Sequence, residues 1–235
     1  MTTSSTAGET PRRRVGRPIK AVLTHESIVK AALELVSGKG YDGLTMSAMA
    51  KKLGVSPSAL YNHVTNKHEV LILIEDHLAA QVDVSAFDTK PWKEAVSDWA
   101  WSYRQVFAQH TPLIPIVAVL PVTDAPRTLA MYEAVSAGFR RAGFPQERIV
   151  PAIVALESFI FGSAYDATAP ADIFNTGASA PSTPNFTSAV SSFEATEGGS
   201  NPDRAFGMGL DALIGGFGVF LPLSPEAEAA AHPAR

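Results

Sequence analysis

The sequence predicts an all-α protein in which a small N-terminal domain with a helix-turn-helix precedes a larger helical domain. Apolar residues recur at intervals of three and four along most of the chain, and no stretch alternates in the manner of a strand. The length of 235 residues and the 46% hydrophobic composition are sufficient for both domains. We therefore expect a disordered basic arm at 1–20, the small domain at 21–80 and the larger domain at 81–235.

The composition limits the chemistry that the chain can perform. There is no cysteine, which excludes disulfides, thiolate catalysis and cysteine-based zinc sites and suits a reducing cytosol. The opening residues, MTTSSTAGETPRRR, contain no apolar stretch of the kind that a signal peptide needs. The longest apolar runs are shorter than the ~20 residues of a bilayer span and carry Pro151, Glu157 and Pro222. We expect a soluble, cytoplasmic protein with no membrane partner.

Basic residues are concentrated near the start of the chain, although the whole chain carries a formal charge of −4. Residues 1–80 contain ten Lys and Arg against seven Asp and Glu, whereas residues 81–235 contain nine against sixteen. Between Arg12 and Lys67 there are ten basic residues and only three acidic ones. This distribution suits a polyanionic partner, although a solvated basic tail would show the same charge.

The first two helices of the small domain are predicted from their caps and their apolar faces. Thr24 is an N-cap for a helix that ends at the SGKG stretch, residues 37–40. Thr45 is a second N-cap, and Gly54 suits the left-handed position that follows a helix. The apolar residues of the two helices are Ile28, Ala31, Ala32, Leu35, Val36, Met46, Met49, Ala50 and Leu53.

A third, shorter helix follows almost directly. Ser56 is its N-cap and Pro57 its first residue, where a missing N–H removes no hydrogen bond. Two helices joined by so tight a glycine-containing turn form a helix-turn-helix. Asn66 with Glu69 resembles a capping box that opens a fourth helix. The apolar residues of that helix are Val70, Leu71, Ile74 and Leu78.

The third helix is too short to be needed for core volume, and its outward side chains are small or hydrogen-bonding, so it fits the major groove of DNA. Taken singly, Tyr61 is better interpreted as a core aromatic and His63 as a cation at a helix C-terminus. Their common face on a helix-turn-helix favours contact with DNA instead. The residues expected at base edges are Ser58, Ala59 and Asn62, and those expected at phosphates are Tyr61, His63 and Lys67.

The stretch GLTMSAMAKKLGVSPSALYNHVTNKHEVL, residues 43–71, resembles the DNA-binding domain of the TetR family of bacterial repressors. The resemblance extends from Thr24 to about Leu78, and the later chain is similar to the tetracycline-repressor type of C-terminal domain. It implies phosphate contacts at Tyr61, His63 and Lys67, base contacts at Ser47 and Ala59, and flanking positions at Ser58 and Asn62. Because Ser47 and Ala59 are small, the operator sequence does not follow from them.

A basic segment, PRRRVGRPIK, precedes the small domain. Its GRP is similar to an AT-hook, although Val15 stands where the usual motif has Arg. A disordered basic arm can reach into the minor groove, where arginine is drawn to A·T-rich DNA. A solubilising tail is an equally good interpretation of any one of its arginines. With the arm included, the DNA-binding candidates are Arg14, Arg17, Thr45, Ser47, Ser56, Ser58, Ala59, Tyr61, Asn62, His63 and Lys67.

Long helical patterns occupy the chain beyond about Asp83. Helices are expected from Trp92, after Pro126, after Pro145 and at about 203–220. Residues 167–201 are rich in Gly, Ala, Ser, Thr and Pro, and we interpret them as a mobile loop with one helical piece, FTSAVSSFEA.

Two of these helices, at 146–165 and 203–220, are apolar beyond a single stripe, so they have more surface to bury than one small bundle can cover. Four glycines of the last helix, at 207, 209, 215 and 216, lower its helix propensity, which indicates that a close helix approach matters there. The family resemblance implies the same, because its members pair through a four-helix interface. We expect a homodimer, whose two recognition helices span one turn of DNA, roughly 34 Å.

Aromatic residues of the larger domain are candidates for the wall of an effector cavity, although a core position is the favoured interpretation for any single one. Glu157 is either an orienting polar group in that cavity or a hydrogen-bonding group at the dimer interface. Pro112 and Pro115 interrupt helical hydrogen bonding beside it and predict a bend. The ligand-binding candidates are Trp99, Tyr103, Phe107, His110, Glu157 and Phe161. The resemblance implies a metal-bound drug held by a histidine after His110, but TPLIPIVAVLP contains none, which argues against magnesium-tetracycline.

Other classes of function find little support. The motifs G-x-S-x-G and H-E-x-x-H, a P-loop and a dinucleotide fingerprint are absent from the sequence, so an enzyme is the weakest alternative. An architectural protein that coats DNA without an effector has no use for 81–235. The sequence predicts a homodimeric repressor that binds a palindromic operator in double-stranded DNA, uses no cofactor or metal, and releases the operator when a small apolar or aromatic effector binds.

Overall fold

The computed structural model of the chain describes residues 23–195 and 201–222. Within these ranges the elements are helices and there are no strands, which confirms the predicted all-α fold. The expected basic arm, with Arg14 and Arg17, lies outside the described residues.

Four helices build the small domain, called here the head. They are α1 (His25–Lys39), α2 (Met46–Leu53), α3 (Pro57–Tyr61) and α4 (Lys67–Ala79), with the short 3-10 helix η1 (Tyr41–Gly43) after α1.

The remaining helices form the larger domain. They are α5 (Ala86–Thr89), α6 (Trp92–Ala108), α7 (Ile114–Val117), α8 (Pro126–Arg141), α9 (Gln146–Asp166), α10 (Pro184–Glu194) and α11 (Asn201–Phe217), with the 3-10 helices η2 (Thr111–Leu113), η3 (Gly177–Ser182) and η4 (Gly218–Phe220).

The predicted caps of the head are confirmed. The Thr24 hydroxyl accepts the Ser27 N–H at 3.2 Å, and the Ser27 side chain completes the capping box. Gly54 closes α2 in the left-handed conformation with φ 66°. The Ser56 hydroxyl accepts the Ala59 N–H at 3.2 Å, which begins α3 directly after that glycine. The tight turn between α2 and α3 is therefore dictated by the sequence.

One predicted cap differs in detail. The Asn66 side chain accepts the Glu69 N–H at 2.9 Å, as expected for the start of α4. The Glu69 carboxylate, however, accepts the backbone N–H of Thr65 at 2.6 Å and its hydroxyl at 2.8 Å, not the Asn66 N–H. Because Thr65 supplies two donors to one oxygen, it is the better partner, and these bonds lower the pKa of Glu69.

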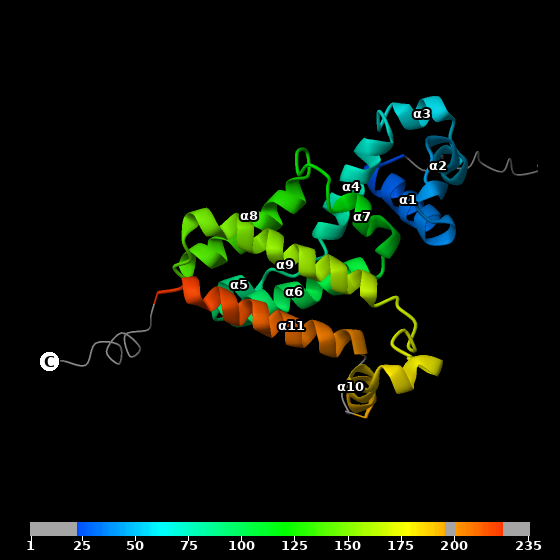
Figure 1. The fold of residues 1–235 in the computed structure, drawn as a ribbon. Coiled ribbons are helices and arrows are strands. Elements are labelled where there is room, and N and C mark those ends of the chain that lie inside the picture. Colours follow the sequence, from blue (N-terminus) through cyan, green and yellow to red (C-terminus); the bar gives the residue numbers. More distant parts are fainter. Residues whose placement is uncertain (1–22, 196–200, 223–235) are drawn as a thin grey trace, which may run out of the picture.

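The larger domain is organised around α6 and α9, which pack against each other (Figure 1). Helix α8 packs against α9, α6 and α5, and α11 packs against α9 and α6. Helix α10 contacts η3 and has no buried residue, so it adds nothing to the core. The helical piece expected within 167–201 is therefore present, whereas the mobility of that segment stays a prediction.

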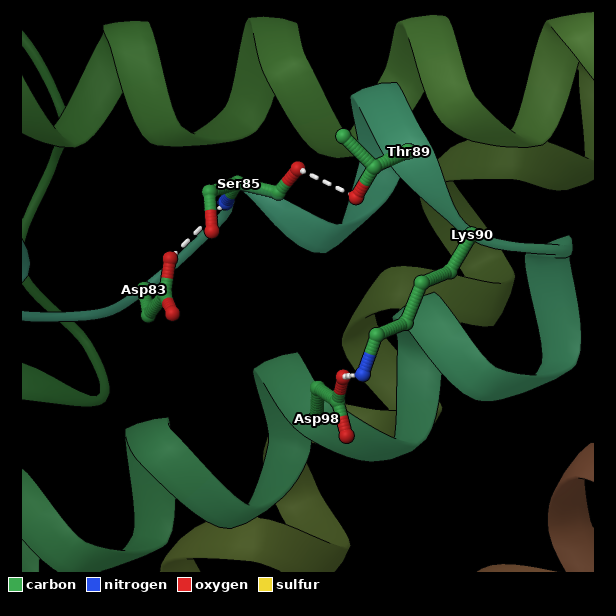
Figure 2. A network of polar contacts seen from close by, with 5 residues as sticks. All are labelled: Asp83, Ser85, Thr89, Lys90 and Asp98. Carbon is green, nitrogen blue, oxygen red and sulfur yellow. Dashed lines mark hydrogen bonds and ion pairs between the residues drawn. The ribbon is translucent and has the colours of Figure 1, made fainter.

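Helix α4 belongs to both domains. It packs against α1 in the head and against α6, α7 and α8 in the larger domain, and one continuous apolar core runs through the contacts. After α4 the chain is tied down by polar contacts (Figure 2). The Asp83 carboxylate accepts the Ser85 N–H at 2.9 Å, and Lys90 pairs with Asp98 of α6 at 2.6 Å. The Asp83 N–H donates to Ser102 of α6 at 2.8 Å. Both ends of α4 are thus connected to packed or hydrogen-bonded neighbours.

The expectation that every apolar run falls short of a membrane span is wrong for α9. This helix has 21 residues and is long and apolar enough to cross a bilayer by length and composition. About a third of its most apolar stretch is buried, against α6, α8 and α11. The helix begins after Pro145 and continues through Pro151 and Glu157, so it is longer than the apolar run of the sequence.

Candidate functional site

The third helix presents a polar face on the surface of the head. Leu60 and Val64 are buried and anchor α3 against the head, whereas Ser58 and Asn62 are exposed. Tyr61 is 50% exposed, so the core interpretation of this aromatic is wrong. The side chains of α3 that were expected at DNA therefore lie on the outside.

The two helix N-caps of this motif carry their hydroxyls at the same surface. Thr45 accepts the Ala48 N–H at 3.1 Å, and Ser56 accepts the Ala59 N–H at 3.2 Å. Both residues are exposed, and each hydroxyl hydrogen remains able to donate. Ser47 is exposed and Ala59 is half-buried. These small groups allow a close approach of DNA to the two helices.

The end of α3 is held by α1. The Nε2 atom of His25 lies 3.2 Å from the backbone oxygen of His63, while the His63 side chain is exposed. A contact between residues so far apart in the chain fixes the orientation of α3 relative to α1. Because α1 also packs on α4, the recognition helix is tied to the helix that enters the larger domain.

Lys67 is bound more closely to the head than the sequence suggested. Its Nζ atom donates to the backbone oxygen of Tyr41 at 3.4 Å and lies 3.6 Å above the centre of the Tyr41 ring. The side chain is half-buried. An ammonium group has three donors, so it can keep the Tyr41 contact and still offer a donor to a phosphate. A phosphate contact at Lys67 stays a prediction.

Most of the predicted effector residues gather between α6 and α9. The rings of Tyr103 and Phe107 lie 5.1 Å apart, and both pack edge to face on Phe161, at 5.5 and 5.1 Å. Trp99 lies 5.6 Å from Tyr103 and is fully buried, and its indole N–H has no partner among the described residues. In this structure the rings fill the space between the helices with one another.

A polar centre adjoins these rings. The Oε1 atom of Glu157 accepts the Tyr132 hydroxyl at 2.7 Å and the Tyr103 hydroxyl at 3.1 Å, so it links α9 to α8 and α6. Burial raises the pKa of Glu157, and the two hydroxyl bonds oppose that effect. Burial beside Glu157 raises the pKa of Tyr103, so this phenol stays protonated and donating. Of the two predicted roles for Glu157, the position inside the domain favours an orienting group over a dimer contact.

The structure adds Glu75 of α4 to this centre, a residue that the sequence interpretation missed. Only 8% of Glu75 is exposed, and its Oε2 atom has no hydrogen-bonding partner among the described residues. Burial, together with the charges of Glu157 and Asp76, raises the pKa of Glu75 to about 7. The sequence carries one indication that Glu75 is buried: it stands four residues after Leu71 and so lies on the apolar face of α4.

Asp76, the next residue of α4, binds the larger domain in a different manner. Its Oδ1 atom accepts the backbone N–H groups of Arg127 and Thr128 at 2.6 and 3.2 Å, in the first turn of α8. A carboxylate at this position satisfies two N–H groups that the helix itself leaves without partners. Asp76 therefore fixes the start of α8, and Glu75, the residue before it in α4, reaches the polar centre.

His110 follows the ring cluster in the chain, and its backbone N–H donates to the backbone oxygen of Phe107 at 2.9 Å. It is half-buried at the end of α6, just before η2, and burial lowers its pKa, with His77 of α4 adding to the effect. Pro112 and Pro115 stand in the first turns of η2 and α7, so the predicted bend is a pair of helix starts. Because η2 contacts α1 and α7 contacts α4, this bend borders the head.

Two open cavities lie outside the aromatic cluster. One of about 710 Å³ is bordered by α1, α4 and the start of α8, and one of about 850 Å³ lies along α6 near Asp203. Neither is lined by the rings expected to hold an effector. Within residues 23–195 and 201–222 no three His, Asp or Glu side chains come together in a manner suited to a metal ion.

Both halves of the chain match known family models. Residues 28–74 match the bacterial regulatory proteins of the tetR family, and residues 87–220 match the tetracyclin repressor-like C-terminal domain. The second match alone covers more than half of the chain.

Individual proteins show the same likeness. An HTH-type transcriptional regulator of Saccharopolyspora erythraea is 29% identical over 144 residues, which cover 61% of this chain and 61% of that regulator. The class A tetracycline repressor from transposon 1721 of Escherichia coli is 28% identical over 210 residues, 83% of this chain and 90% of the repressor. The crystal structure of ActR from Streptomyces coelicolor in complex with actinorhodin is 26% identical with a TM-score of 0.70, and the match covers 84% of this chain and 96% of ActR.

Proposed function

The chain belongs to the tetR family of bacterial regulatory proteins, and from that premise we propose that it is a repressor that binds a palindromic operator as a homodimer and releases it when a small molecule binds the larger domain. The observation that carries the proposal is the course of α4, which begins in the head and carries Glu75 to the polar centre beside the aromatic rings. A molecule bound there changes the surroundings of a helix that positions the DNA-binding face.

Recognition of DNA is supported by the exposed face of α3. Phosphates are held by Tyr61, His63 and Lys67, and bases are read through Ala59 and Asn62 with help from Ser47 of α2. Arg14 and Arg17 of the preceding arm add minor-groove contacts. Such a regulator works where the chromosome lies, in the cytoplasm. No catalytic role, cofactor or resident metal belongs to this proposal.

Pairing of two copies is supported by the outer faces of α9 and α11. Val150 and Val154 are 66% and 53% exposed, and Met208 of α11 is 74% exposed. Gly162 of α9 and Gly215 of α11 have no atom of another element within 4 Å of the position that a Cβ would take. Because α9 and α11 pack side by side, they form one apolar surface, and two such surfaces pair around a twofold axis as a four-helix interface.

Response to a small molecule is supported by relatives of the chain. ActR was crystallised in complex with actinorhodin, and the transposon protein is named a tetracycline repressor. We propose an apolar or aromatic effector that enters between α6 and α9 by displacing Phe161, which is the half-buried member of the ring cluster. Trp99, Tyr103 and Phe107 then form the walls.

The test begins with finding the operator. Purified protein is mixed with fragments of the source genome, and the retained fragments are sequenced. We expect a palindrome, bound much more tightly than either half-site alone. Retention of all fragments without preference would instead indicate an architectural DNA-coating protein.

The second part of the test uses the operator found in this way. Thermal-shift screening of aromatic metabolites and antibiotics identifies compounds that stabilise the protein, and each is then tested for release of the operator. Ligands that stabilise the protein and never weaken operator binding would contradict the proposed control.

A further inference from the structure

The polar centre of the larger domain contains two carboxyl groups, those of Glu75 and Glu157, with no positive charge paired to them among the described residues. Glu75 of α4 lies close enough to Glu157 of α9 for the charge of Glu157 to act on it, and Glu75 is buried while Glu157 is half-buried. Within residues 23–195 and 201–222 neither carboxyl group pairs with Lys, Arg or His. Buried carboxylates in proteins are normally paired with a cation, because transfer of an isolated charge out of water is costly. The part of the chain that the structure describes supplies no such cation to these two.

The free acceptor at this centre belongs to Glu75. Glu157 already receives the hydroxyl groups of Tyr103 and Tyr132 on one oxygen. Glu75, by contrast, is 8% exposed, and its Oε2 atom receives nothing from the described residues. An acceptor left in this state lacks a donor that a bound molecule can provide.

A cluster of aromatic rings adjoins the same place through Tyr103. Tyr103 both donates to Glu157 and packs against Phe107 and Phe161, so the carboxyl pair and the ring cluster share a residue. Aromatic faces attract cations, and carboxylates attract them more strongly, particularly where water is excluded. The combination is suited to a positive charge carried on an apolar molecule.

We propose that the effector site takes a lipophilic aromatic amine, whose protonated nitrogen lies between Glu75 and Glu157 while its rings replace the packing among Tyr103, Phe107 and Phe161. This inference rests on the proposed function and specifies its ligand class. A neutral donor would satisfy Oε2 of Glu75 but leave the two carboxyl groups repelling each other whenever both are ionised. A cation provides a donor for Oε2 and also offsets the repulsion between the carboxyl groups.

The same contact explains how such a ligand acts on DNA binding. Glu75 is followed by Asp76, which holds the first turn of α8 through two backbone N–H groups. A cation that draws Glu75 towards Glu157 of α9 pulls on α4 at that attachment. The opposite end of α4 packs on α1, which contacts the end of α3 through His25 and His63. The ligand thus favours one position of the head over another.

The experiment uses nortriptyline, a tricyclic aromatic amine, and its neutral N-formyl derivative. Binding to the full chain is measured by calorimetry with the wild type, with Glu75→Gln and with Glu133→Gln. Glu133 lies on the outside of α8 beside Tyr132 and controls for the loss of a carboxylate elsewhere. We expect the amine to bind the wild type and Glu133→Gln about tenfold or more tightly than the neutral derivative, and Glu75→Gln to lose most of that preference.

Several outcomes overturn the inference. They are no binding of nortriptyline, equal binding of the two compounds by the wild type, or a preference that Glu75→Gln retains in full. Circular dichroism and thermal unfolding check that Glu75→Gln is folded, and the amide removes the charge while it keeps the size of the side chain. If this variant proves unstable, Glu157→Gln provides the same comparison.

The operator assay separates this inference from the proposed function. Binding of nortriptyline with the expected charge preference, but without release of DNA, supports the ligand class and contradicts effector control. Release of the operator by a molecule without an amine, equally in the wild type and Glu75→Gln, supports effector control and overturns the ligand class.

Discussion

Glu75 is the residue whose ionisation is least compatible with its surroundings. Burial and the neighbouring Glu157 and Asp76 raise its pKa from 4.5 to about 7, so the folded protein retains a proton that the unfolded chain releases. A raised acid pKa leaves stability unaffected below the ordinary value and lowers it as the pH rises from that value to the folded value, above which the loss is constant. The groups that face Glu75 come from four helices: Asp76, Tyr103, Tyr132 and Glu157.

We therefore expect Glu75→Gln to be more stable than the wild type at high pH and equal to it at low pH. The difference in the free energy of unfolding should be near zero at about pH 4 and on the order of 2 kcal/mol at about pH 8. Urea denaturation followed by circular dichroism at both pH values measures it. Glu133→Gln, which removes an exposed carboxylate from α8, should follow the wild type. A difference for Glu75→Gln that does not change with pH would show that its carboxyl group titrates normally.

The exposed residues of α3 divide into two roles, and substitutions can distinguish them. Tyr61→Phe removes a hydroxyl without removing charge, so it should weaken binding to the operator and to unrelated DNA by the same factor. Asn62→Ala should instead change which bases are preferred, by about 1–3 kcal/mol at one position of each half-site. Fluorescence anisotropy with operator variants measures both. A change of base preference in Tyr61→Phe with none in Asn62→Ala would reverse the assignment.

Lys67 needs a separate measurement because its ammonium group already contacts Tyr41. If it also neutralises a phosphate, Lys67→Ala should reduce the slope of log affinity against log salt by about 0.9 for each bound chain. An unchanged slope would leave Lys67 as a structural contact within the head.

Residue roles were predictable where local chemistry decides them. Thr24, Thr45 and Ser56 cap helices because each hydroxyl accepts a backbone N–H that the first turn of the next helix leaves free. The sequence shows both the hydroxyl residue and the apolar pattern of the helix that follows it. Glu75 and Tyr132 could not be assigned in this way, because their meeting with Glu157 depends on how four helices pack. Periodicity identifies the buried face of a helix but not which residue of another helix it meets.

At the scale of elements, the contact between α4 and α8 is the main joint between the domains. The Asp76 carboxylate accepts two N–H groups at the start of α8. Asp76→Ala should lower the free energy of unfolding by about 1–2 kcal/mol, as for the loss of a helix cap. It should also weaken the effect of an effector on DNA binding, because α4 then moves without α8.

The control for this substitution is Asp88→Ala, which removes an exposed ion pair with Arg141 of α8 at 3.4 Å. Exposed pairs contribute little, so we expect a change below about 0.5 kcal/mol. Equal effects of the two substitutions, measured by urea denaturation, would show that Asp76 does not hold α8 specifically.

Element positions followed from the sequence more closely than element lengths. Helices α6, α8, α9 and α11 lie where the apolar periodicity placed them, since long amphipathic patterns leave few alternatives. Pro112 and Pro115 predict a bend, and the chain there forms η2 and α7 because each proline fits the first turn of a helix. Proline stops one helix and starts another equally well, and the sequence alone does not show which.

At the scale of the whole molecule, the expected division near residue 80 passes through continuous packing. The core of the head and the core of the larger domain join along α4. This continuity was not visible in the sequence, where a change in composition suggested a boundary, because composition reports charge and not contact. We therefore expect the two domains to move as coupled bodies, which effector control of DNA binding requires.

The outer faces of α9 and α11 provide the test of assembly. Val154 of α9 is 53% exposed in the single chain and lies at the centre of the proposed dimer surface. Val154→Glu places a charge there, and pairing would bury that charge without a partner. We therefore expect the dissociation constant of the dimer to rise by a factor of about 100 or more. Light scattering should then give the mass of one chain, and thermal unfolding should change little at concentrations where the wild type is also a monomer.

The matched control is Val119→Glu, at a position after α7 that is 80% exposed and far from α9 in the sequence. It makes the same chemical change and should leave the dimer intact. Because a single α3 buries too little surface to be selective, Val154→Glu should bind the full palindrome no better than a half-site, whereas Val119→Glu should keep the preference. A monomeric Val154→Glu that retained full affinity for the palindrome would mean that the two heads are brought together by DNA itself, and dissociation by both substitutions would place the interface elsewhere.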